Sequence, residues 1–323
     1  MHRFRSPRGL VLLVCLVAAF AVACASPSTS SVAAGGATPS TAAAYPMTIN
    51  AANGKVTLDA MPTRIVSMSP TATEMLFAIG AGDQVVAADS YSDYPSDAPT
   101  TKLSAFEPNA EAIANYEPDL VVYAEDPGDL QGSLDKLKIP ALSEPAAATM
   151  DDVYAQMEQL GQATGHPDDA TAQATALKTK IQGIVDQVGD AGKGMTYYYE
   201  LDDTYYSATS DTFIGAVLGE LGLKNIADQA KGASSGYPQL SAEYIVQADP
   251  DLIVLADTRC CGQDAEKVAK RPGWSDLTAV QNGGVVELDD DVASRWGPRI
   301  ADLLQQVGDA VIARSQGSVQ GSG

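Results

Sequence analysis

Two short segments of the chain share one pattern of apolar and polar positions. In each, a short amphipathic stretch ends at Pro-Asp, and four consecutive apolar residues follow. The first segment runs from Asn109 to Ala124 and the second from Ser241 to Ala256, with matching positions 132 residues apart. Continuous apolar runs are typical of strands in a parallel sheet covered on both faces. Each segment therefore predicts a capped helix followed by a buried strand.

Strand and helix patterns alternate on both sides of each copy. Apolar runs predict further strands over 64–68, 84–88, 139–142, 195–201 and 285–288, and helical spacing predicts helices over 71–79, 212–221 and 298–314. Because this alternation favours parallel sheets, we expect two similar α/β lobes. Before the first lobe, Asn53-Gly54 is a strong hairpin signal.

One long helix is predicted between the lobes. Asp168 and Asp169 suit a helix start, and apolar residues recur at helical spacing through Ala170, Ala174, Leu177, Ile181, Ile184 and Val188. An ordinary surface helix has the same pattern, but its position between duplicated halves favours a spacer. The predicted divisions are a first lobe with its leading hairpin (47–166), the spacer helix (167–190), a second lobe (191–315) and a disordered tail (316–323).

The start of the chain has a different pattern. Three arginines precede an apolar run over 10–22, which is shorter than the roughly 20 residues that span a bilayer and is typical of a secretory signal. Ala21-Val22-Ala23-Cys24 resembles a bacterial lipobox; ordinary cleavage with an incidental Cys24 is the alternative. Small and polar residues follow, as in a flexible linker. We predict a signal peptide (1–23) and a tether (24–46), lipid-anchored through Cys24 to the outer face of the cytoplasmic membrane.

Composition argues against two broad classes of function. Acidic residues outnumber basic ones by 41 to 20, for a net charge of −21, whereas nucleic-acid binding needs a basic surface. The two histidines are His2, within the predicted signal, and His166. Histidine-based acid–base or nucleophilic catalysis therefore has almost no residues to use. We expect neither a nucleic-acid partner nor an enzyme.

Two adjacent cysteines belong to the second lobe. Cys15 leaves with the signal and Cys24 is the predicted anchor, so Cys260 and Cys261 have only each other as intramolecular partners in an oxidising compartment. Neighbouring Cα atoms lie ~3.8 Å apart across a trans peptide, closer than most disulfides allow. We predict a strained vicinal disulfide, with free thiols as the alternative. Two cysteines without a nearby histidine do not complete a zinc site, and we predict no metal site.

Aromatic and charged residues cluster in the predicted loops of both lobes. Ligands of open α/β sheets bind outside the carboxyl ends of the strands, and several of these residues fall there. Because they come from both halves of the chain, they predict a cleft between the lobes. The candidate ligand-binding residues are Tyr91, Tyr237, Asp291, Arg295 and Trp296.

Several motifs together resemble one known family. They are the segment 64–74, Ser90-Tyr-Ser-Asp-Tyr-Pro95, the two Pro-Asp segments and Trp296-Gly-Pro-Arg299-Ile300. Over residues 47–314 the chain is similar to the iron-siderophore/cobalamin periplasmic-binding family. The resemblance implies two α/β lobes bridged by one rigid helix, with a small-molecule metal chelate held between them. It also implies delivery of that chelate to an ABC importer, a permease dimer with its ATPase.

Within the family, the Tyr91 segment is most similar to the cobalamin-binding members. The resemblance implies that Tyr91 lines a corrinoid pocket, that Tyr237 replaces a tryptophan and that Asp291 matches a ligand-contacting aspartate. Ala105 and Ala124 stand where those members place tryptophans. Either the pocket is wider or it holds another ligand.

Other ligands and one other class of function stay open. The acidic run 289–291 also suits a cationic ferric chelate. Haem has no histidine placed as an axial ligand, although tyrosine can serve. We expect no cofactor apart from the metal that the ligand itself carries. The alternative function is a ligand-sensing extracellular module that signals to a membrane receptor.

Glu111 and Glu243 occupy matching positions near the starts of the two duplicated helices. Acidic residues in a first helical turn interact favourably with the helix dipole, which is a purely structural explanation, and shared ancestry of the halves could preserve both. The family resemblance implies instead that these glutamates form salt bridges with permease arginines. A pseudo-twofold binder would then meet a twofold partner.

Overall fold

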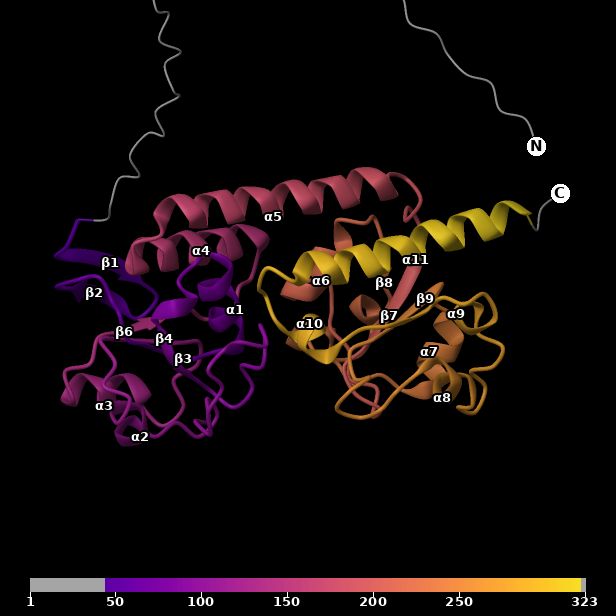
Figure 1. Cartoon of the computed structure of the whole chain (residues 1–323). Coiled ribbons are helices and arrows are strands. Elements are labelled where there is room, and N and C mark those ends of the chain that lie inside the picture. Colours follow the sequence, from indigo (N-terminus) through magenta and orange to yellow (C-terminus); the bar gives the residue numbers. More distant parts are fainter. Residues whose placement is uncertain (1–43, 321–323) are drawn as a thin grey trace, which may run out of the picture. The chain divides into compact units, whose positions relative to one another are not determined.

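The computed structural model describes residues 44–320, which belong to one compact unit of the chain, Thr41–Gly323. The predicted signal peptide, Cys24 and most of the tether lie outside the described residues. Two lobes follow one another along the chain, each with one four-stranded sheet and flanking helices, and the hairpin before the first of these sheets forms a separate two-stranded sheet (Figure 1). Among the described residues, no helix is long and apolar enough to cross a membrane.

The strands and helices have the following bounds. The strands are β1 (Met47–Ala51), β2 (Gly54–Leu58), β3 (Ile65–Met68), β4 (Val85–Ala88), β5 (Leu120–Tyr123), β6 (Ala141–Ser143), β7 (Thr196–Glu200), β8 (Lys224–Asn225), β9 (Leu252–Leu255) and β10 (Val285–Glu287). The helices are α1 (Pro70–Ala78), α2 (Ala110–Ala114), α3 (Leu130–Lys136), α4 (Met150–Thr164), α5 (Pro167–Val188), α6 (Phe213–Gly219), α7 (Ala242–Ala248), α8 (Ala265–Ala269), α9 (Thr278–Gln281), α10 (Asp290–Ser294) and α11 (Ile300–Gln320).

The two lobes have the same sheet topology. The strand orders are β4-β3-β5-β6 and β10-β9-β7-β8, and all neighbours are parallel. When the strands are numbered within each lobe, both sheets have the order 2-1-3-4. The central pair is β3 and β5 in the first sheet and β7 and β9 in the second. Ile65 pairs with Leu120 in the first sheet, and Tyr197 pairs with Leu252 in the second, where Leu252 lies 132 residues after Leu120. The predicted duplication is therefore preserved in the central strand pair, and the predicted α/β fold class is confirmed.

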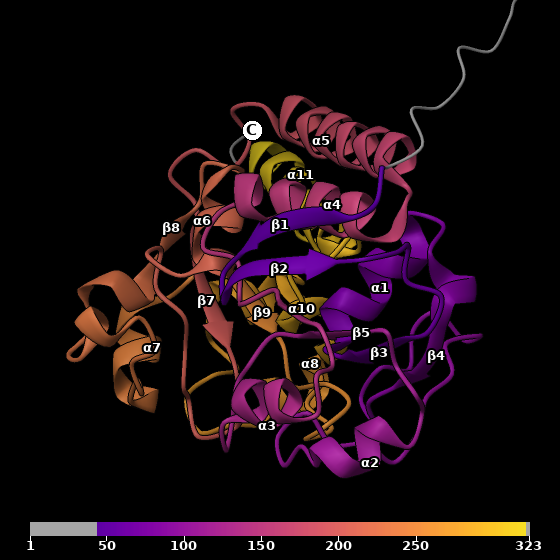
Figure 2. The same cartoon turned by 90° about the vertical axis from the view of Figure 1, so that its left-hand side faces the viewer.

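The hairpin turn differs by one residue from the prediction. Ala51 pairs with Gly54, so the turn consists of Ala52 and Asn53 rather than Asn53-Gly54. The Asn53 side chain attaches the hairpin to β6, the edge strand of the first sheet, because its amide donates to the backbone oxygen of Ala141 and accepts from the backbone N–H of Ser143. The hairpin also lies alongside α4, where Gln159 donates to the Asn50 carbonyl (Figure 2).

Helix α5 runs over both lobes, packing against α4 at its start and against α11 further on (Figure 1). Its buried face consists of the six apolar residues predicted from helical spacing. The close approach of α4 and α5 requires Gly161, where an added Cβ would lie 2.3 Å from the Cβ of Ala170. Residues of α5 belong to the same buried apolar cluster as residues from both sheets. A bridging role for this helix follows from that shared core.

The end of the chain corrects one prediction. Helix α11 continues to Gln320, so residues 316–320 are helical rather than a disordered tail, and 321–323 lie outside the described residues. Helical spacing of apolar residues ends earlier in the sequence, because small and polar residues dominate from Ser315 onward. The helices α3, α4, α8, α9 and α10 and the two-residue strand β8 were not predicted. The capping box formed by Thr149 and Asp152 is the local signal that marks the start of α4.

Candidate ligand cleft

A cleft of about 430 Å³ lies between residues of the two lobes. Its lining from the first lobe comprises Met68, Ser69, Pro70, Thr71, Asp89, Tyr91, Ala105, Phe106, Ala124, Glu125 and Pro127. Its lining from the second lobe comprises Asp291, Ser294, Arg295 and Trp296. Four of the five predicted binding residues are therefore at the cleft.

The strand order explains the position of the cleft. In a 2-1-3-4 sheet, the connections that leave β3 and β5 run to opposite sides, which opens a crevice at the carboxyl ends of these two strands. Ser69 follows β3 and Ala124 follows β5, and both line the cleft. The first lobe thus provides the floor, and the segment around α10 closes it from the second lobe.

Aromatic side chains form two walls. Tyr91 and Phe106 make an edge-to-face pair with ring centroids 5.4 Å apart, and both are exposed, at 56% and 71%. Across the cleft, Trp296 is half-buried, and its indole N–H donates to Gln156 Oε1 at 3.0 Å. Phe106 was not among the predicted site residues. Phe106 could have been predicted from the sequence, because it is the neighbour of Ala105, which the family resemblance places at the pocket.

A buried carboxylate shapes the Tyr91 loop. Asp89 is fully buried at the end of β4, where its Oδ1 accepts from the Tyr91 N–H at 2.9 Å and its Oδ2 accepts from the Ser92 hydroxyl at 2.6 Å. Burial raises the pKa of Asp89, and the hydrogen bond from Ser92 partly offsets that effect. Asp89 therefore fixes the backbone that carries Tyr91 at the cleft.

Arg295 reaches the cleft but is engaged by protein groups. Only 7% of its side chain is exposed. Its Nη1 donates to Glu74 Oε1 at 2.8 Å, and its Nη2 donates to the Tyr91 carbonyl at 2.8 Å and to Asp291 Oδ1 at 2.6 Å. A fourth acceptor, Asp93, lies 3.2 Å from Nη2. These contacts let Arg295 position the cleft walls, and its direct contact with a ligand stays a prediction.

A second arginine of the second lobe, Arg299, also binds Glu74. Arg299 donates through Nε to Glu74 Oε2 at 3.0 Å and through Nη2 to Glu74 Oε1 at 2.5 Å. The Arg299 guanidinium also lies 4.2 Å from the ring centroid of Tyr94. The Glu74 side chain is only 1% exposed. One buried carboxylate of the first lobe thus joins two guanidinium groups of the second.

The acidic run 289–291 is largely paired within the second lobe. Arg259 Nη1 lies 3.1 Å from Asp289 Oδ2 and 2.9 Å from Asp291 Oδ2. Asp290 accepts from the backbone N–H groups of Arg259 and Cys260. Burial raises the pKa of Asp291, and Arg295 partly offsets that effect. Of the three carboxylates, Asp291 is the one that lines the cleft.

Tyr237 is not among the cleft-lining residues. It precedes α7, its side chain is 55% exposed, and its backbone N–H bonds Ser235 Oγ at 3.1 Å. The loop is held elsewhere, because the Pro238 carbonyl accepts from the Ser207 N–H. The structure therefore brings together four of the five predicted residues and leaves Tyr237 outside.

Cys260 and Cys261 are exposed free thiols in the structure, with their sulfur atoms 2.7 Å apart. The structure thus contains the state named as the alternative, and the vicinal disulfide stays a prediction. The two cysteines follow β9, in the loop whose Arg259 contacts Asp291.

Glu111 and Glu243 lie in the first turns of α2 and α7 and are both exposed. The helices are capped alike: Asn109 accepts from Ala112 N, and Ser241 accepts from Tyr244 N. Hydrogen bonds from the backbone and from Ser241 hold the pKa of Glu243 below its usual range. Both helix starts are therefore capped by Asn109 and Ser241, and neither needs its glutamate as the capping residue.

Two α/β lobes with parallel sheets, a long helix across them and a cleft at their strand ends are the architecture of a two-lobed substrate-binding protein. The family model described as periplasmic binding protein matches residues 65–292. The chain belongs to this family, whose members act as substrate-binding components of ABC transporters.

Individual relatives agree with this assignment. A Bacillus subtilis protein named YvrC, an ABC transporter substrate-binding lipoprotein, is 30% identical over 83% of this chain and 86% of its own length. A cobalamin-binding protein of Halobacterium salinarum is 31% identical over 83% of this chain and 75% of its own. The crystal structure of the periplasmic vitamin B12-binding protein BtuF of Vibrio cholerae is similar with a TM-score of 0.65, at 26% identity over 79% of this chain and 99% of that one.

Proposed function

We propose that the chain is the extracytoplasmic, lipid-anchored binding protein of an ABC importer and that it captures a corrinoid such as cobalamin. The observation that carries the proposal is the aromatic cleft, with Tyr91 and Phe106 on one lobe facing the Trp296 side of the other. Large aromatic faces give flat macrocycles a wide contact area at low entropic cost. The cobalamin-binding relatives support the same ligand class.

The acidic run 289–291 has little free charge left for a cationic ferric chelate. Asp289 and Asp290 are paired with Arg259 and with backbone N–H groups, and Asp291 shares its carboxylate between Arg259 and Arg295. These carboxylates are therefore already largely neutralised. A corrinoid is larger than the cleft and would extend beyond it, and we propose Tyr237 as a contact for the part outside.

A parallel titration tests the proposed ligand. The quenching of intrinsic tryptophan fluorescence would be followed with cyanocobalamin, haem and ferric hydroxamate siderophores, using the purified domain 44–323. We expect saturable binding of cyanocobalamin at one equivalent per chain, at least about tenfold tighter than for the other ligands, a difference of roughly 1.4 kcal/mol. Tighter binding of a siderophore or of haem would overturn the corrinoid assignment while leaving the family intact.

Trp296→Ala is expected to weaken cobalamin binding by at least about tenfold, because tryptophans at binding sites commonly contribute about 2 kcal/mol or more. Trp296 is half-buried and lies at the edge of the core, so the melting temperature of the free protein should change little. Tyr154→Ala, on α4 and outside the cleft, is the matched aromatic control and should bind as wild type. Equal affinities of the two variants would show that Trp296 does not contact the ligand.

The lipid anchor is proposed from Cys24 and from the lipoprotein relative. Cys24→Ser should release the protein into the medium or leave the precursor uncleaved, because no acceptor thiol remains for the acyl chains. Mass spectrometry of the membrane-associated wild type is expected to show a diacylated N-terminal cysteine. An unmodified Cys24 within a membrane-bound chain would contradict the anchor.

A further inference from the structure

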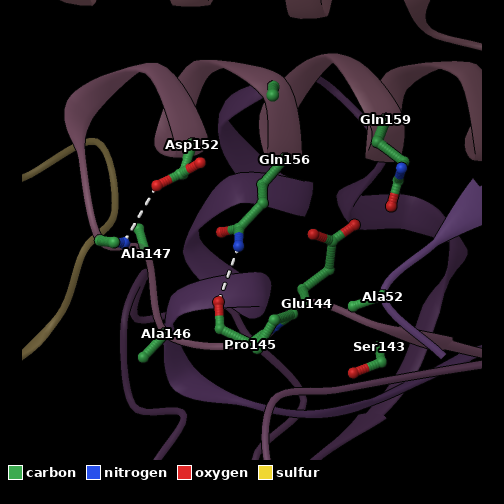
Figure 3. Close-up of a pocket in the computed structure, with 11 residues that line it drawn as sticks. Ala52, Ser143, Glu144, Pro145, Ala146, Ala147, Asp152, Gln156 and Gln159 are labelled. Atoms are coloured by element: carbon green, nitrogen blue, oxygen red, sulfur yellow. Dashed lines mark hydrogen bonds between the residues drawn. The ribbon is translucent and has the colours of Figure 1, made fainter.

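A second pocket, of about 300 Å³, lies within the first lobe (Figure 3) and shares no lining residue with the cleft. It is formed by the end of β6, the first half of α4 and the hairpin turn. Small alanine side chains make up much of its wall. Its polar lining residues are Ser143, Glu144, Asp152, Gln156 and Gln159.

Glu144 is the distinctive group in this pocket. It is 3% exposed, and among the described residues its Oε1 has no hydrogen-bond partner. Burial raises the pKa of its carboxyl to about 8. Figure 3 shows the carboxyl group directed toward α4, between Gln156 and Gln159. A buried acceptor without a partner costs free energy that a bound donor would recover.

Two further polar residues, Gln159 and Asp152, present acceptors to the pocket. Gln159 uses its Nε2 to donate to the Asn50 carbonyl at 2.9 Å, which leaves its amide oxygen on the pocket side (Figure 3). Hydrogen bonds from Thr149 hold the pKa of Asp152 below its usual range, so this carboxyl is ionised at neutral pH. No lysine, arginine or histidine occurs among the described residues that line the pocket. The pocket therefore suits a positively charged donor with a short apolar body.

We propose that this pocket binds a small aliphatic ammonium ion, with Glu144 as its carboxylate partner. The ammonium group donates to the Glu144 carboxylate and to the Gln159 amide oxygen, and the alkyl chain lies against the alanines. Gln156 forms the boundary with the cleft, because its Nε2 donates to the Pro145 carbonyl and its Oε1 accepts from Trp296. The site stands on its own residues and does not depend on which ligand the cleft holds.

Propylammonium chloride is a suitable probe, followed by the NMR signal of the ¹³C-labelled Glu144 carboxyl at pH 7. The largest binding free energy that each of its four non-hydrogen atoms can contribute means that its dissociation constant is no smaller than roughly 40 μM. We expect saturable binding with the Glu144 signal moving in the direction of ionisation. Potassium chloride at equal ionic strength and neutral propanol should not reproduce the change.

Two variants separate the site from general charge effects. Glu144→Gln removes the carboxylate at nearly constant shape and should weaken binding at least tenfold, measured through backbone amide shifts of α4. Glu158→Gln removes a glutamate charge from an exposed position on α4, and this variant should bind propylammonium as wild type does. The affinity of the wild type should also rise from about pH 6 to about pH 9 as Glu144 ionises, since Asp152 is already charged and the ammonium keeps its proton.

Three results would overturn the proposal. They are a linear response to propylammonium without saturation, an equal response to potassium chloride, and unchanged binding by Glu144→Gln. Each would mean that Glu144 is a buried neutral acid without a ligand. None of them would affect cobalamin binding, which the titration of the cleft measures separately.

Discussion

Glu74→Gln is expected to lower the melting temperature of the protein by about 5–10 °C. The substitution replaces the buried carboxylate that joins Arg295 and Arg299 of the second lobe to α1 of the first. Removing one partner of a buried ion pair costs about 3 kcal/mol or more, because the remaining charges stay buried without compensation. In a domain of this size each kcal/mol corresponds to roughly 2–4 °C. Calorimetry of the ligand-free domain measures the change.

Glu111→Gln provides the matched control for this prediction. It removes a glutamate from a helix of the same lobe, but Glu111 is exposed and has no ion-pair partner within 4.0 Å among the described residues. Its effect should stay within about 0.5 kcal/mol. If the two variants melt within about one degree of each other, the Glu74 contacts do not hold the two lobes together.

The double substitution Glu111→Lys and Glu243→Lys should abolish uptake through the cognate importer while ligand affinity and melting temperature stay near those of wild type. We propose that both carboxylates dock onto basic residues of the permease. Their exposure, and their matching places on α2 and α7, support that role. Reversing both charges replaces two attractions with two repulsions at a polar interface. Ligand uptake into cells, together with binding by the purified variant, measures the two effects separately.

A second double variant controls for net charge. Glu158→Lys and Glu220→Lys changes the charge equally, with one exposed glutamate in each lobe, and should transport as wild type. Transport by the Glu111/Glu243 double variant, or loss of its ligand binding, would contradict the docking role.

The sequence predicted the architecture because the duplication repeats local patterns. Both Pro-Asp segments carry a helix cap, a stop and an apolar strand within sixteen residues, and local patterns of this kind survive in the fold. Strand β8 escaped prediction because its two residues, Lys224 and Asn225, form no apolar run. Helix α4 could have been predicted, because the capping box of Thr149 and Asp152 is followed by Val153, Met157 and Leu160 at helical spacing, and this pattern was overlooked.

The site was predictable to the extent that strand ends could be located. Tyr91, Asp291 and Trp296 follow predicted strands and line the cleft. The ion pair between Arg295 and Glu74 could not be predicted, because the two residues lie 221 positions apart in the sequence and no local pattern links them. The position of Tyr237 depends on a long loop without regular strands. Such contacts arise only when the whole chain has folded.

The most direct test of the central claim is a crystal structure of the domain with cyanocobalamin. We predict the corrin ring in the cleft between the lobes, with Tyr91 and Phe106 on one side and Trp296 on the other. The Glu74–Arg295 pair should be intact beneath it. Cobalamin bound elsewhere on the protein, or a cleft that stays empty at saturating cobalamin, would contradict the proposed function.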